Sequence, residues 1–126
     1  MQRPCGFLCR DPKHIKSDGP LVEAPSLIHS NDGVYSLFFS SGCTRVPSHD
    51  LKYVTSKDAG PSKRTSKPLL VTGDWNLLAP GSVLVRRESQ RWRMVFHSRI
   101  TTPFRGVRTM HTAALVLSGT NVSFDT

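Results

Sequence analysis

The chain has 126 residues, of which 37% are hydrophobic, and its 17 Lys and Arg against 9 Asp and Glu leave a net charge of +8. A chain of this length builds at most one globular domain. It contains no run near the roughly 18 consecutive apolar residues of a membrane-spanning helix, which excludes a transmembrane protein. The apolar content, with 2 Trp, 2 Tyr and 6 Phe, is too high for a wholly disordered chain, so a modest hydrophobic core is expected.

Residues 1–20 carry basic side chains among Pro and Gly and have no sustained apolar period. This pattern predicts a disordered basic tail. Its apolar stretch is much shorter than the roughly 7 to 15 residues of a signal peptide, so we expect no export signal in the chain as written.

The three cysteines are Cys5, Cys9 and Cys43. They form no C-x-x-C pair and have no histidine at a zinc-finger spacing, so a structural zinc site is not expected. Two states stay open: a bridge between Cys5 and Cys9 in an oxidising compartment, or three reduced thiols.

From Leu21 onward, short runs rich in Val, Leu, Phe and Tyr alternate with clusters of Gly, Pro, Asn, Asp and Ser, which is typical of β-strands joined by turns. The expected strands are Leu21–Ile28, Val34–Ser41, Leu51–Ser56, Pro68–Thr72, Ser82–Arg86, Trp92–His97, Val107–Leu117 and Val122–Phe124. Asp32-Gly33 favours a tight hairpin between the first two. No segment has a convincing helical period, so the sequence predicts an all-β fold of two antiparallel, four-stranded sheets packed face to face. Each unit has the size of one β-propeller blade.

Several motifs, in order, resemble glycoside hydrolase family 43. The segments VEAPSLI at 22–28, NDGVYSLFFSSG at 31–42 and DLKYVTS at 50–56 resemble its fourth blade. The segments PLLVTGD at 68–74, APGSV at 79–83, WRMVFH at 92–97 and RTMHTAAL at 108–115 are similar to its fifth and last blade. The resemblance implies that residues 21–126 are the C-terminal part of a five-bladed β-propeller.

The family removes arabinofuranosyl or xylosyl groups from plant polysaccharides with inversion, so the resemblance implies a glycosidase with a carbohydrate substrate and an extracellular location. Inverting hydrolysis needs a carboxylic acid that protonates the leaving oxygen and a carboxylate, roughly 6.5 to 9.5 Å away, that activates water. Glu23 matches the family's general acid, and its place between Val22 and Ala24 predicts partial burial. The alternative is an exposed strand residue near a sheet edge.

Two further residues match substrate-side positions on the family's last blade. The resemblance places Arg108 beside the active-site channel, where it binds substrate or holds a carboxylate, and His97 matches a recurrent histidine. As isolated residues, Arg108 would be a solvated surface charge and His97 a structural histidine. Many members carry a cation-binding histidine directly before Gly-Ser-Val, but here that segment reads Ala79-Pro80-Gly81-Ser82. We therefore expect no metal and no cofactor.

The remaining acids and aromatics have simpler explanations. Turn residues or strand caps are expected at Asp32, Asp50, Asp58 and Asp74. Tyr53, Trp75 and Trp92 could stack on sugar rings, although a strand aromatic usually packs in the core.

Length limits what this chain does alone. Five blades need well over 200 residues at roughly 40 to 50 each, whereas residues 21–126 provide two. The expectation is a truncated chain that lacks the general base, has little turnover, and self-associates through open blade faces and edges.

Two other functions stay open. A non-catalytic carbohydrate-binding remnant would keep Glu23 and Arg108. A nucleic-acid-binding module would suit the charge of +8, but the basic residues are scattered and no recognition motif is present, so we expect no nucleic-acid partner.

Overall fold

The computed structural model describes residues 22–43, 47–58, 67–102 and 106–125. The expected disordered tail at 1–20, with Cys5 and Cys9, lies outside them. Cys43 is buried and disulfide-bonded, so the three thiols are not all reduced. Within the described residues, no helix has the length and apolar character needed to cross a membrane.

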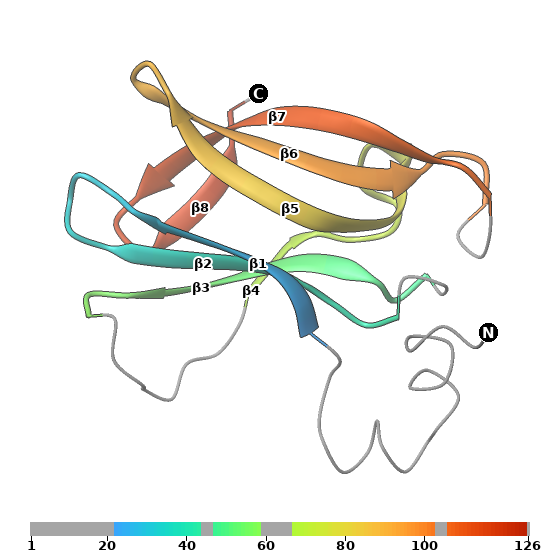
Figure 1. Ribbon diagram of the computed structural model, residues 1–126, viewed down its shortest axis with the longest axis horizontal. Helices are drawn as coiled ribbons and strands as arrows, with labels where there is room; N and C mark the ends of the chain where they lie inside the picture. The colour runs from blue at the N-terminus through green and yellow to red at the C-terminus, as the bar shows by residue number, and fades with distance from the viewer. Residues whose placement is uncertain (1–21, 44–46, 59–66, 103–105, 126) are drawn as a thin grey trace, which may run out of the picture.

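The fold is all-β, as predicted. The elements are β1 (Val22–His29), β2 (Tyr35–Ser41), β3 (Asp50–Ser56), β4 (Lys67–Leu70), the short 3₁₀ turn η1 (Asp74–Asn76), β5 (Leu78–Glu88), β6 (Arg91–Arg99), β7 (Arg108–Ser118) and β8 (Asn121–Phe124). They form two four-stranded sheets, β1-β2-β3-β4 and β5-β6-β7-β8, in which each strand pairs antiparallel with the next (Figure 1).

The predicted hairpin joins β1 to β2. Gly33 has a φ of 80°, the left-handed conformation that an Asp-Gly turn needs. Its N–H donates to the Ser30 carbonyl oxygen at 3.0 Å, and the Ser30 N–H donates to the Val34 carbonyl oxygen at 2.9 Å. The turn therefore sets the register of the first two strands.

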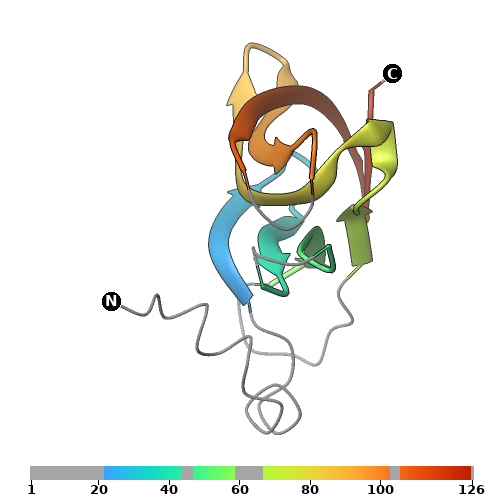
Figure 2. The ribbon, with the colours of Figure 1, turned by 90° about the vertical axis from the view of Figure 1, so that its right-hand side faces the viewer.

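The two twisted sheets stack on one another, with β5 against β1, β2 and β3 (Figure 2). Alternate residues of each strand fill the space between them. The buried apolar core is Ile28, Phe38, Leu51, Tyr53, Leu70, Leu77, Val83, Val85, Met94, Phe96, Leu115 and Val122.

Side-chain oxygens of the first sheet also accept hydrogen bonds from backbone N–H groups of the second. Ser26 Oγ accepts from Val85 at 3.0 Å, and Ser40 Oγ accepts from Ser82 at 2.7 Å. A buried polar group without a hydrogen bond would lower the stability of the fold, and these bonds prevent that loss. They also fix one sheet against the other.

Strand β5 departs most from expectation, because it begins at Leu78 rather than at Ser82. Its pairing with β6 shifts between Leu78 and Gly81 and again between Gly81 and Leu84. These bulges accommodate Pro80, which a regular strand interior does not tolerate.

The outward faces of both sheets keep apolar side chains in solvent. Leu27 on β1, Leu84 on β5 and Met110 on β7 are 62%, 58% and 78% exposed. Exposed apolar groups and open strand edges favour association, so self-association stays a prediction of the sequence.

Candidate functional site

Polar side chains gather where β1, β5 and β7 begin and β6 ends. The residues are Glu23 on β1, His97 on β6, Arg108 at the start of β7 and His49 just before β3. The register brings the second-sheet members together, because Gly81 pairs with His97 and Arg99 pairs with Arg108. Two of the three predicted site residues, His97 and Arg108, are thus in direct contact.

Hydrogen bonds from Nη1 to two groups of the second sheet help to hold Arg108 in place. Its Nη1 donates to the Ala79 carbonyl oxygen at 2.8 Å and to His97 Nδ1 at 2.6 Å. Because Nδ1 accepts, the His97 ring is neutral and carries its proton on Nε2. The contact therefore fixes the orientation of both side chains.

Burial and neighbouring positive charge disfavour the charged forms of this pair. The pKa of His97 is lowered to about 4, first by burial and then by Arg108. The pKa of Arg108 is lowered to about 10 by burial and by Arg99, with Glu23 opposing the shift. At neutral pH, His97 is accordingly a neutral N–H donor and Arg108 a cation.

His49 completes the cluster, and the sequence patterns do not predict it. It is fully buried and donates through Nδ1 to the Gly42 carbonyl oxygen at 3.0 Å, while its Nε2 has no hydrogen-bond partner among the described residues. A Cβ on Gly81 would lie 2.0 Å from that Nε2, so the packing requires glycine there. Burial lowers the pKa of His49. No local motif marks His49, because its close packing against Gly81 joins the segment before β3 to the second sheet.

Glu23 is exposed, so the expectation of partial burial is wrong. The reason is local: β1 is an edge strand, and its pairing with β2 is irregular between Glu23 and Ser26, where Ala24 has a φ of 53°. The carboxylate of Glu23 favours the charged forms of both Arg108 and His49. It therefore lies within electrostatic range of both.

Other acids are engaged locally. Asp32 accepts from the Ser30 hydroxyl, and Asp74 accepts from the Val71 N–H at 3.0 Å. Asp50 accepts from the Ser41 hydroxyl and lies 3.7 Å from the Lys52 ammonium. No set of three or more His, Cys, Asp or Glu within the described part of the chain is placed to hold a metal ion.

Stability should fall as the pH drops from about 6.5 toward about 4. His97 has an ordinary pKa of 6.5 when unfolded and about 4 when folded. Between these values the unfolded chain binds more protons, so stability that is fully present above 6.5 is lost on acidification. Burial also lowers the pKa of His49, so this residue adds to the loss of stability on acidification. Urea unfolding at several pH values should show the decline, with a weaker pH dependence in His97→Gln; equal dependence in both proteins would contradict it.

Comparisons with known proteins show what this arrangement is similar to. No family model matches the chain, and no curated protein matches it. Among solved structures, a thermostable family-43 glycoside hydrolase is 23% identical, with a TM-score of 0.71 over 85% of this chain and 36% of its own. An α-L-arabinanase from Cellvibrio cellulosa complexed with arabinohexaose is 19% identical, with a TM-score of 0.68 over 82% of this chain and 36% of its own.

An endo-1,4-β-xylanase from Bacteroides thetaiotaomicron is 25% identical, with a TM-score of 0.70 over 84% of this chain and 38% of its own. This chain thus spans little more than a third of the length of these structures. It has the glycosidase-like fold of two β-propeller blades.

Proposed function

We propose that this chain carries the general-acid half of a glycoside hydrolase site of the family-43 type, for arabinose- or xylose-containing polysaccharides. One observation carries the proposal: Glu23 lies within electrostatic range of Arg108, and Arg108 is hydrogen-bonded to His97. The fold around these residues is similar to that of a solved arabinanase and a solved xylanase. Glu23 is the proton donor to the leaving oxygen, as inverting hydrolysis requires.

The other two residues act as substrate contacts. The guanidinium of Arg108 is a cation that hydrogen bonds to Ala79 and His97 help to orient. His97 carries its proton on Nε2, and its pKa of about 4 keeps the ring neutral near pH 7, so that Nδ1 still accepts from Arg108 while Nε2–H is a donor. Both groups suit the hydroxyl and ring oxygens of a sugar.

The second carboxylate of an inverting pair has no counterpart in this cluster. Asp50 also acts on His49, but Ser41 and Lys52 already engage it. In the proposal, the base comes from protein outside the described residues, and the isolated chain binds sugar with little turnover. An extracellular location follows from the same resemblance and stays a prediction, and a non-catalytic sugar-binding role is the alternative.

Calorimetric titration with arabinotriose and xylotriose tests the substrate side. Replacing Arg108 with Ala removes charged hydrogen bonds, so affinity should fall about tenfold or more. Arg86→Ala is the matched control, because Arg86 is exposed on β5 and lies outside the cluster. Circular dichroism confirms that each variant folds. Equal affinity of the Arg108→Ala variant and the parent would contradict the assignment.

A further inference from the structure

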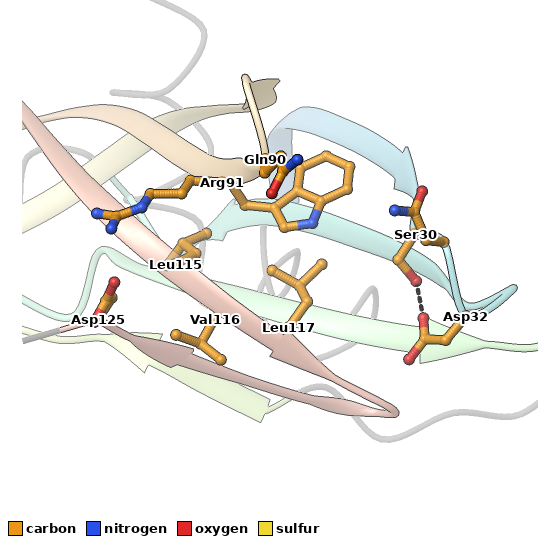
Figure 3. Close-up of a pocket in the computed structure, with 10 residues that line it drawn as sticks. Ser30, Asp32, Gln90, Arg91, Leu115, Val116, Leu117 and Asp125 are labelled. Atoms are coloured by element: carbon orange, nitrogen blue, oxygen red, sulfur yellow. Dashed lines mark hydrogen bonds between the residues drawn. The ribbon is translucent and has the colours of Figure 1, made fainter.

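A separate open groove lies at the opposite end of the sheets from Glu23. It has a volume of about 420 Å³ and is bordered by the β1–β2 turn, by the β5–β6 turn and by β7 (Figure 3). Glu23, His97 and Arg108 do not line it. Any ligand bound there is therefore distinct from one at the proposed glycosidase site.

The floor of this groove is apolar and includes an aromatic ring. Trp92 on β6 and Leu115 on β7 are direct cross-strand partners. Leu115 belongs to the core between the sheets, and the partly buried Trp92 packs against that core. Leu117 continues the same face. A flat, partly buried indole beside aliphatic side chains offers a surface for the C–H face of a ring.

The rim is polar and carries both signs of charge. Figure 3 shows Asp32 and Asp125 toward opposite ends of the groove, with Leu115 and Leu117 between them, and Gln90 and Arg91 along one side. Carboxylates accept hydrogen bonds, whereas guanidinium donates and an amide does both. A ligand that fits this rim must donate and accept at neighbouring atoms.

Hydrogen bonds between the sheets hold part of the rim in place. Asp32 accepts from the Ser30 hydroxyl and, through Oδ2, from the Gly119 N–H at 3.1 Å. Asn31 Oδ1 accepts from Arg87 Nη1 at 3.0 Å, which leaves the Asn31 amide N–H groups as donors. A rim ordered before binding lowers the entropy that a ligand would lose there.

These features select one class of ligand. Two carboxylates disfavour an anion, Arg91 disfavours a cation, and a purely apolar ligand would leave the rim groups without water or a partner. A neutral sugar ring combines an apolar C–H face with hydroxyls that both donate and accept. We propose that this groove is a carbohydrate-binding site for a neutral sugar unit of a polysaccharide, independent of Glu23.

The test follows the two indole N–H signals by nuclear magnetic resonance during titration with arabinotriose or xylotriose, with Trp75→Phe used to assign them. The proposal expects a saturable shift of the Trp92 signal. The Gln90→Ala/Arg91→Ala double variant should bind about tenfold more weakly by this signal, because it loses rim contacts. Gln90 is exposed on the β5–β6 turn and Arg91 is exposed at the first position of β6, so the fold should persist. Arg86→Ala, on the same hairpin but outside the groove, should match the parent.

The result must also be independent of the proposed glycosidase site. Glu23→Gln and Arg108→Ala should leave the Trp92 titration unchanged, even if the glycosidase proposal fails. A Trp92 signal that does not move up to the solubility limit of either sugar would overturn the inference. So would a shift that the double variant leaves unaltered, or one that Arg108→Ala abolishes.

Discussion

The purified chain is expected to hydrolyse aryl arabinofuranosides and xylosides no faster than its Glu23→Gln variant. Loss of a general base typically costs about 10² to 10⁴ in rate, and two blades do not enclose the channel that would orient the sugar. Release of nitrophenol from both substrates, measured against a protein-free blank, checks this. Clear hydrolysis by the unmodified chain that disappears in Glu23→Gln would show that the described site is sufficient on its own.

The same substitution should behave differently once a base is supplied. In a chimaera that places residues 22–125 in the corresponding part of the thermostable family-43 glycoside hydrolase, Glu23→Gln should lower turnover about 10²-fold or more, because it removes the proton donor. Arg86→Ala controls for assembly of the chimaera. An active chimaera with the same rate with and without Glu23 would refute its role.

Phe38→Ala should remove a large part of the stability of the domain. Phe38 is 0% exposed at the centre of the core between the sheets, and truncation of a buried Phe costs about 3–5 kcal/mol. A domain of this size has roughly 5–15 kcal/mol of unfolding free energy in total. Urea denaturation monitored by tryptophan fluorescence measures the loss.

Leu27→Ala is the matched control, since Leu27 is a similar apolar residue on the neighbouring strand but is 62% exposed. It should change stability by about 0.5 kcal/mol or less. A large effect of Leu27→Ala would mean that the outer face of the first sheet is covered in solution, as self-association would require. Equal effects of the two substitutions would contradict the described core.

The strand order could be read from the sequence because most strands alternate buried and exposed residues between clear turns. The expected run Val34–Ser41, for example, is found as Tyr35–Ser41, after a turn that Gly33 closes. The sequence does not predict the start of β5 at Leu78, because Ala79, Pro80 and Gly81 lack a strand pattern. The pairing with β6 passes from Leu78 to Gly81 through an irregularity in which Ala79 has a φ of 46°. Bulges of this kind come from tertiary contacts rather than from local propensity.

The site was less predictable than the fold. The contact of Arg108 with His97 follows from the β6–β7 register. The family resemblance placed both residues on the same blade but did not predict that they touch. The exposure of Glu23 and the burial of His49 depend on how one sheet lies against the other. The groove beside Trp92 was missed for the same reason, since its rim joins turns of both sheets.

A residue-resolved nuclear magnetic resonance titration with arabinotriose and xylotriose tests whether Glu23, His97 and Arg108 form a sugar-binding site. Saturable shifts are expected for the His97 imidazole and Arg108 guanidinium signals and for the Glu23 backbone amide. A random-sequence oligonucleotide should leave these signals in place at physiological salt. Fixed signals with either sugar, together with salt-sensitive shifts caused by the oligonucleotide, would contradict the glycosidase assignment and favour nucleic-acid binding.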